Sequence, residues 1–178
     1  MSVRRISVVL SAALIASSLG ACASRGPTFG FEPDRAREQR IQAEYASYRQ
    51  RGTAVISGRA WLELPDGRRV LASRSAVQLT PVTSLSREFI DEALRTGDWS
   101  SQVLARERAV VWTTRTDDQG HFDFSMLPPG DYYILCTTSW RDTAGHTQDT
   151  ILVVQTHVED GELREVVLAG NVTPQPER

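Results

Sequence analysis

The chain has 178 residues, with 20 arginines, no lysine and 22 acidic residues, so its formal net charge is −2 when the histidines are neutral. A chain of this sign has little electrostatic attraction for nucleic acid or for an anionic membrane surface, which argues against both as partners. The length is sufficient for one domain with its own hydrophobic core.

The first residues have the layout of a secretory signal. Arg4 and Arg5 precede an apolar stretch at 6–19, which is too short to span a bilayer as a helix. The stretch ends in Leu19-Gly20-Ala21-Cys22, which resembles the lipobox of bacterial lipoproteins. The alternative is an ordinary signal peptide with an incidental cysteine.

The lipobox resemblance implies that residues 1–21 are removed and that the Cys22 thiol takes a diacylglycerol. The expected location is the cell envelope, with the membrane as a partner through the acyl chains. Ala23 rather than an aspartate follows the cysteine, which favours the outer membrane, facing the periplasm, by the sorting pattern of enteric bacteria. Lipidation of Cys22 leaves Cys136 without a disulfide partner, so a packed core must stabilise the domain.

Residues 22–52 are expected to form a lipidated tether followed by an amphipathic helix. The small residues, glycines and prolines of 23–33 are typical of a tether, and 34–52 has helical spacing. The helix has one narrow apolar stripe, made by Ile41, Tyr45 and Tyr48. The stripe could either dock on the domain or contact a partner, and the sequence favours both alternatives equally. A membrane-surface helix is less favoured, because the apolar area is small.

Residues 53–170 change to a period of two, which indicates strands. The segment TAVISGRAWLELPDGRRVLA predicts a hairpin around Asp66-Gly67, and Pro81 places SAVQLTPVT at a sheet edge or ends that strand. Five more strands are expected at ERAVVWTTRT, HFDFSM, DYYILCTTSW, DTILVVQTHV and LREVVLAG. These seven or eight short strands predict a β-sandwich, followed by a disordered polar tail at 171–178.

A helical insertion is expected at about 84–106, between two of the strands. Ser86 is the predicted N-cap, with Leu85 and Ile90 as a hydrophobic staple, and Gly97 is the predicted end. Its apolar face would consist of Phe89, Ile90, Ala93 and Leu94.

The stretch TDDQGHFDFSMLPPGDYYIL, from Thr116 to Leu135, is the most informative in the chain. Its aspartates and Gly120 predict a turn, and Phe122 and Phe124 fall on the opposite face of a strand from Asp123. In the next strand, alternation places Tyr132, Ile134 and Cys136 inward, and Tyr133 and Leu135 on the other face.

This stretch resembles the carboxypeptidase regulatory-like domain, a transthyretin-like fold. The residues that carry the resemblance are Thr116, Asp117, Gly120, Phe122, Phe124, Leu127, Pro128, Gly130, Tyr132 and Ile134. It implies an all-β Greek-key β-sandwich over 53–170, from which the helical insertion is a departure. The motif is specific for the fold and says little about function.

No catalytic, metal or cofactor site is expected. His121, His146 and His157 are scattered, and Asp117 and Asp118 are explained by the turn, so neither a hydrolase nor a calcium site is favoured. An inward position predicts that Cys136 is an inert small hydrophobe.

Ligand binding is considered at exposed tryptophans. Trp140 lies at a strand end beside Arg141 and His146, and Trp99 lies in the insertion. Trp140 and Trp99 could each stack on a sugar ring, but the favoured interpretation is that they cap the ends of the sandwich. Trp61 and Trp112 are expected in the core or on a sheet face. The sequence therefore favours a non-enzymatic, membrane-anchored interaction or structural module, with an envelope protein as partner. The alternative is a periplasmic glycan- or peptidoglycan-binding protein.

Overall fold

The structure is a computed structural model that describes residues 35–99, 110–142 and 144–171. The predicted signal, Cys22, the tether, the end of the predicted insertion and residues 172–178 of the tail lie outside the described residues. In chain order the elements are α1 (Arg35–Glu44), the 3-10 turn η1 (Ser47–Arg49), β1 (Ala54–Glu63), β2 (Arg69–Leu71), β3 (Ala76–Pro81), α2 (Ser84–Thr96), β4 (Trp112–Arg115), β5 (His121–Leu127), β6 (Gly130–Arg141), β7 (Thr147–Val158) and β8 (Leu163–Asn171). Neither described α-helix has the length and apolarity needed to cross a membrane.

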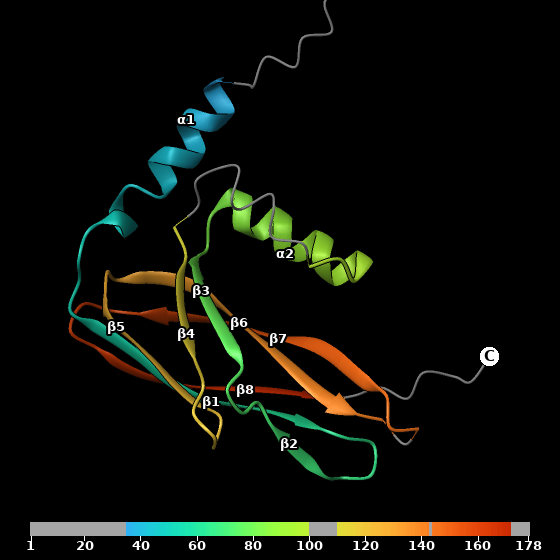
Figure 1. The fold of residues 1–178 in the computed structure, drawn as a ribbon. Helices are drawn as coiled ribbons and strands as arrows, with labels where there is room; N and C mark the ends of the chain where they lie inside the picture. The colour runs from blue at the N-terminus through green and yellow to red at the C-terminus, as the bar shows by residue number, and fades with distance from the viewer. Residues whose placement is uncertain (1–34, 100–109, 143, 172–178) are drawn as a thin grey trace, which may run out of the picture. The chain divides into compact units, whose positions relative to one another are not determined.

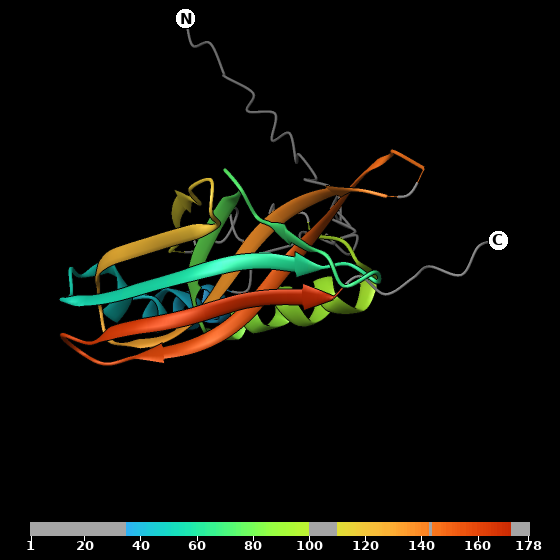
Figure 2. The same ribbon diagram turned by 90° about the horizontal axis from the view of Figure 1, so that it is seen from below.

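The strands form two four-stranded sheets, which confirms a β-sandwich (Figure 1). In sheet A, β1 pairs antiparallel with β2 and β5, and parallel with β8 along its other edge. In sheet B the order is β4-β3-β6-β7, all antiparallel. Figure 2 shows β1 and β8 side by side at the outer face of sheet A, over which no described helix lies.

The main core lies between the two sheets. From sheet A it receives Ile56 and Leu62 of β1 and both phenylalanines of β5, and from sheet B it receives alternate residues of β3 and β6. The predicted faces of β5 are confirmed, because Phe122 and Phe124 are buried while Asp123 is exposed. Cys136 is fully buried in the same core, and burial raises the pKa of its thiol to about 11, so it is protonated and unreactive at neutral pH.

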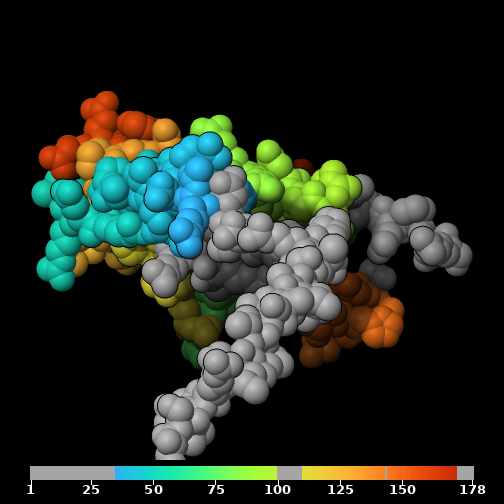
Figure 3. Space-filling view, turned by 90° about the horizontal axis from the view of Figure 1, so that it is seen from above, coloured from blue at the N-terminus to red at the C-terminus, as the bar shows by residue number. Residues whose placement is uncertain are grey.

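The outer face of sheet B is also buried in part, where α1 and α2 cover it. Tyr133 and Leu135, the residues of β6 that point away from the main core, pack with Ile41 of α1, with Tyr45 just after α1 and with the apolar face of α2. The Thr83 hydroxyl donates a hydrogen bond to the Tyr45 hydroxyl over 3.1 Å. The two helices lie next to each other in the space-filling view, α1 in blue to cyan and α2 in yellow-green (Figure 3). The predicted stripe of Ile41, Tyr45 and Tyr48 therefore docks on the domain.

Two details of the helices differ from expectation. The predicted helix at 34–52 ends as an α-helix at Glu44, and Tyr48 belongs to the short 3-10 turn. In α2 the N-cap is Thr83, and Ser86 occupies the third helical position, where its hydroxyl accepts a hydrogen bond from the Thr83 N–H in a capping box. Leu94, expected on the apolar face, is 65% exposed, because the helix contacts the sheet through Leu85, Phe89, Ile90 and Ala93 instead. The predicted C-terminal end at Gly97 is confirmed, with a positive φ of 75°.

The two faces of β5 give a direct test of the core. Phe122→Ala and Phe124→Ala should each lower the free energy of unfolding by about 3–5 kcal/mol, because each leaves a cavity between the sheets. Asp123→Ala, between them and exposed, should change it by less than about 0.5 kcal/mol. Urea denaturation of the three variants measures the difference. Equal unfolding midpoints for Phe124→Ala and Asp123→Ala would contradict the assignment.

Candidate functional site

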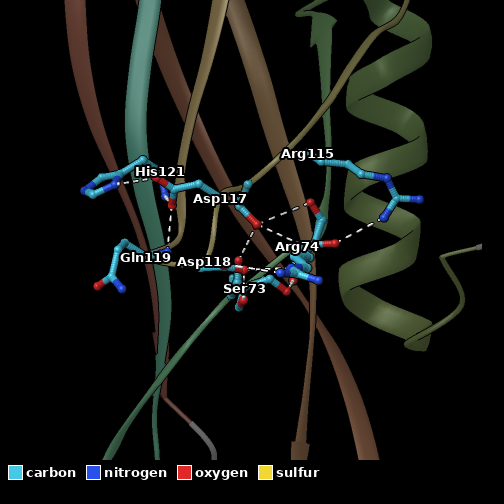
Figure 4. A network of polar contacts seen from close by, with 10 residues as sticks. Ser73, Arg74, Arg115, Asp117, Asp118, Gln119 and His121 are labelled. Carbon is cyan, nitrogen blue, oxygen red and sulfur yellow. Dashed lines mark hydrogen bonds and ion pairs between the residues drawn. The ribbon is translucent and has the colours of Figure 1, made fainter.

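The acidic turn between β4 and β5 is held by its own hydrogen bonds (Figure 4). One oxygen of Asp117 accepts hydrogen bonds from the backbone N–H groups of Gln119 and His121, both at 2.8 Å, and the other faces Nδ1 of His121 at 3.1 Å. The hydrogen bond from the His121 N–H is the main reason why the pKa of Asp117 lies below its ordinary value. Asp117 therefore acts as the acceptor that closes this turn.

The same turn joins the two sheets. The buried Thr116 hydroxyl donates to the Ala72 carbonyl and accepts from the Ser75 N–H, so it fixes the passage from β2 to β3. Gly120 has a φ of +81°, and a Cβ there would lie 2.6 Å from the Ala60 carbonyl oxygen, so the position favours glycine sterically as well as conformationally. Its N–H and carbonyl are used within the fold, the carbonyl accepting from the Ala60 N–H at 2.9 Å.

Asp118 also has a partner within the fold. Both of its oxygens accept hydrogen bonds from the Arg74 guanidinium, at 2.7 and 3.3 Å, and Arg115 donates to the Arg74 carbonyl from the neighbouring strand (Figure 4). No group of three or more histidine, cysteine or acidic side chains in the described part of the chain is arranged to hold a metal ion. The acidic turn thus has a structural role, because the carboxylates of Asp117 and Asp118 already accept hydrogen bonds within the fold.

The three histidines lie on separate turns and strands. Each ring faces one aspartate, at 3.1 Å for His121 with Asp117, 3.0 Å for His157 with Asp131 and 3.6 Å for His146 with Asp142. Within the described residues no serine hydroxyl or thiol is hydrogen-bonded to any of the three rings. These pairs therefore lack the nucleophile that a catalytic triad requires.

The β6–β7 hairpin carries three of the predicted site residues and differs from the expected loop. Trp140 pairs with Gln148, and Arg141 with Thr147, so the strands continue beyond Trp140, which was expected at a strand end. Trp140 is half-buried and packs against the core between the sheets, whereas the next residue, Arg141, is exposed and donates to the Gly145 carbonyl. His146 is exposed at the tip. Only the polar residues of this group lie on an open rim.

Trp99 lies on the opposite face of sheet B from Trp140. Its ring meets Phe89 of α2 edge to face, with 6.4 Å between the centroids. It lines a small pocket of about 110 Å³ together with Phe89, Ala76, Gln78, Leu135, Thr137 and Ile151. The fold therefore separates the two tryptophans that the sequence analysis grouped as possible ligand contacts.

A larger pocket, of about 340 Å³, lies at the edge of the sandwich where β4 of one sheet approaches β5 of the other. Three separate stretches line it: the turn after α1, the start of β4 and the end of β5. We call it the edge pocket, and its lining residues are Tyr48, Arg49, Gln50, Arg51, Val110, Val111, Trp112, Ser125 and Met126.

Aromatic packing against the core holds two of the lining residues, Tyr48 and Trp112. The Tyr132 ring, inside the core, meets Tyr48 at 5.4 Å and Trp112 at 5.8 Å between centroids, both edge to face. The Tyr132 hydroxyl is buried and donates to the Pro128 carbonyl at 2.6 Å. Tyr48 lies so close to Gly130 that a Cβ there would be 2.5 Å from the Tyr48 hydroxyl oxygen. Glycine at position 130 therefore leaves room for the Tyr48 side chain to pack here.

A β-bulge shapes the other wall. Ala54 pairs with Leu127 and Ile56 with Phe124, so Ser125 and Met126 both stand opposite a single residue of β1. Met126 has a φ of +56°, which is rare for a residue with a side chain, and its side chain is 54% exposed. The bulge turns Met126 out of the strand and toward the pocket.

The sequence analysis did not predict the edge pocket. Trp112 was expected in the core or on a sheet face, and its ring does pack on Tyr132, but it also lines the pocket. Arg49 and Arg51 were assigned to the end of a long helix and not to a site. The available signal was Gly52 in the sequence YRQRG, because a glycine is typical of a close backbone approach as well as of a helix end.

Comparison with known proteins finds similar structures but no matching family model or curated sequence. No protein-family model matches the chain, and no curated protein does. Its fold is similar to the crystal structure of a protein from Pseudomonas aeruginosa named a putative carbohydrate binding protein, with a TM-score of 0.60 and 27% sequence identity. The similarity covers 72% of this chain and 95% of that one.

Two weaker likenesses are with larger proteins. The major pilin subunit of Bacillus cereus matches with a TM-score of 0.37 at 13% identity over 68% of this chain and 29% of the pilin. (S)-allantoin synthase matches with a TM-score of 0.32 at 11% identity over 67% of this chain and 42% of the synthase. This chain thus spans less than half of either protein, and these TM-scores support no conclusion.

The structural role of the acidic turn predicts a pH dependence. Because the folded state lowers the pKa of Asp117 below 3.8, its stabilisation is present above that value and is lost as the pH falls through the lower folded value. Asp117→Ala should lower the Tm at neutral pH, and its Tm difference from the wild type should shrink at about pH 3. Thermal melts at the two pH values measure this.

Asp118→Ala is the matched control, because it removes an exposed ion pair from the adjacent position. Such pairs contribute little, so its Tm should stay close to that of the wild type at both pH values. A larger loss for Asp118→Ala than for Asp117→Ala at neutral pH would contradict the role given to Asp117.

Proposed function

We propose that this protein is a non-catalytic, glycan-binding lipoprotein of the bacterial cell envelope. The observation that carries the proposal is its likeness to the Pseudomonas aeruginosa protein, whose name gives it a carbohydrate-binding role, over 95% of that protein's length. The absence of a nucleophile beside the three histidine–aspartate pairs, within the described residues, is consistent with a binding function rather than an enzymatic one.

We further assign the sandwich to the carboxypeptidase regulatory-like, transthyretin-like Greek-key group. The support comes from the motif that suggested it, since each of its special residues has a structural task. Gly120 takes the positive φ of the turn, Tyr132 bonds back to Pro128, and Gly130 makes room for Tyr48.

The edge pocket is the proposed glycan site. Its volume of about 340 Å³ lies within the range of about 300–1,000 Å³ that is usual for small-ligand sites. Trp112 offers part of an indole ring and Met126 an exposed thioether, and both can pack against the apolar face of a pyranose. Arg49, Gln50, Arg51 and Ser125 supply polar groups at its rim. The β6–β7 hairpin has polar residues on its rim, but its tryptophan packs against the core.

A second function is favoured by the outer face of sheet A. Leu163 and Val167 of β8 are 71% and 53% exposed. No described helix lies over the outer face of sheet A (Figure 2). A contiguous apolar patch on an open sheet face would be suited to contact with a protein. A non-enzymatic interaction or structural module that binds an envelope protein is therefore the alternative.

The proposed location is the outer membrane, with the domain facing the periplasm, and the support is the lipobox-like sequence ending at Cys22. No metal or cofactor is required by the proposed function. Acyl chains on Cys22 would hold the domain beside the envelope polymers that are its proposed ligands.

The anchor can be tested in cells. Cys22→Ser should move the protein from the membrane fraction to the soluble periplasmic fraction, because two or more acyl chains give stable anchoring and the variant would carry none. Fractionation after a high-salt wash measures this, and Cys136→Ser serves as the control. A Cys22→Ser protein that stayed with washed membranes would show that another feature holds it there.

The site can be tested by replacing one tryptophan in each candidate place: Trp112 in the edge pocket, Trp99 in the small pocket beside α2 and Trp140 in the β6–β7 hairpin. Trp112→Ala should abolish retention on a panel of immobilised glycans and peptidoglycan, whereas Trp99→Ala and Trp140→Ala should retain it. Trp140→Ala should also lower the free energy of unfolding by a few kcal/mol, because the ring packs on the core. Trp112 also contacts Tyr132, so Trp112→Leu is made in parallel to keep the core filled, and thermal melts establish that each variant is folded.

The outcomes separate the candidate sites and functions. Loss of retention only in Trp140→Ala would move the site to the hairpin and contradict the edge pocket. A wild-type protein that retained no glycan and no peptidoglycan would reject the glycan-binding function and leave the protein-interaction module as the better interpretation.

A further inference from the structure

The edge pocket is lined by positively charged residues, although the chain as a whole has a negative formal net charge. The whole chain is acidic, with a formal net charge of −2, yet the pocket rim carries Arg49 and Arg51. Among the described residues that line it there is no aspartate or glutamate. Two arginine residues therefore line one pocket that has no aspartate or glutamate among its lining residues.

These two arginines differ from many others in the chain. Guanidinium groups on other surfaces pair with carboxylates, as in Arg37 with Glu88, Arg68 with Asp66, Arg74 with Asp118, Arg95 with Glu92 and Arg164 with Glu162. Arg49 instead donates to the neutral side-chain amide of Gln42. Arg51 makes no hydrogen bond or ion pair with any residue that the structure describes, so its donors are available to a ligand.

The backbone that carries both arginines is fixed on each side. Before them, Tyr48 is packed between Tyr132 and the Cα of Gly130. After them, the Gly52 N–H donates to the Met126 carbonyl at 3.1 Å. A Cβ at Gly52 would lie 1.9 Å from the Leu127 carbonyl oxygen, so only glycine allows this approach. The close contacts hold the turn across the edge of the sandwich, with its two cationic residues at the pocket.

We propose that the edge pocket selects acidic sugars, those that carry a carboxylate or a phosphate group. The proposal rests on the glycan-binding function above and names the ligand class. The apolar face of the sugar ring would lie against Trp112 and Met126, and the anionic group would meet Arg49 and Arg51. Guanidinium groups bind carboxylate and phosphate with paired, charge-assisted hydrogen bonds, which are stronger than bonds between neutral groups.

The experiment is calorimetric titration of the mature full-length lipoprotein in detergent with matched sugars. Trigalacturonic acid is compared with its methyl ester, and galactose 6-phosphate with galactose, so that each pair differs only by its anionic group. We expect the acidic member of at least one pair to bind roughly tenfold or more tightly than its neutral counterpart, and to weaken as salt is raised. The pair that responds identifies carboxylate or phosphate as the recognised group.

The variants locate the effect. Arg51→Gln, which breaks no contact with a described residue, and the double variant Arg49→Gln/Arg51→Gln should lose this preference while their melting temperatures stay close to the wild-type value. Arg141→Gln, at the tip of the distant hairpin, removes one charge as well and should keep it. The comparison therefore separates the pocket arginines from a general effect of net charge.

Three results would overturn the inference. Equal affinity for the acidic and neutral sugars, with Trp112 still required, would reject acidic selectivity and leave the proposed glycan function intact. Loss of the preference in Arg141→Gln but not in Arg51→Gln would place the anion site on the hairpin. Binding of no sugar in either pair, together with no retention on the glycan panel, would reject the glycan function itself.

Discussion

Tyr132 and Tyr133 are neighbours in β6, and they are buried on opposite faces of sheet B. Double burial of this central strand is the constraint on which the rest of the structure depends. A four-stranded sheet whose second face carries Tyr133 and Leu135 needs a cover, and α1 and α2 provide it. The covering layer is tied down by Ile41 and by the Tyr45–Thr83 hydrogen bond, so the segment that follows the predicted membrane tether is an integral part of the domain.

The edge pocket is a consequence of that covering layer. Because α1 lies over sheet B while β1 belongs to sheet A, the chain between them must cross the edge of the sandwich. Gly130 gives room for Tyr48 at one side of this crossing, and Gly52 gives room for the backbone at the other. The crossing turn brings Arg49 and Arg51 beside Trp112 and the bulged Met126. A site built in this way depends on close backbone contacts more than on any single functional motif.

The acidic turn and the edge pocket differ in whether their polar side chains are already bonded within the fold. Asp117, Asp118 and Thr116 are conspicuous in the sequence, yet their oxygens are already bound to backbone N–H groups, a guanidinium and a carbonyl (Figure 4). Polar groups that satisfy one another stabilise a fold and leave little for a ligand. Arg51 has no such partner among the described residues, and its place at the pocket, rather than any sequence pattern, makes it a candidate for recognition.

The sequence by itself determined the features that depend on near neighbours. Alternation assigned Phe122 and Phe124 to the core and Asp123 to solvent, and the need for a positive φ identified Gly97 and Gly120. Only the tertiary structure decided that the strands of the β6–β7 hairpin continue past Trp140, that Leu94 is exposed, and that Trp112 lines a pocket. The reason is physical: periodicity reports which face a residue occupies, whereas burial by another layer and the closing of a cavity depend on segments that are distant in the chain.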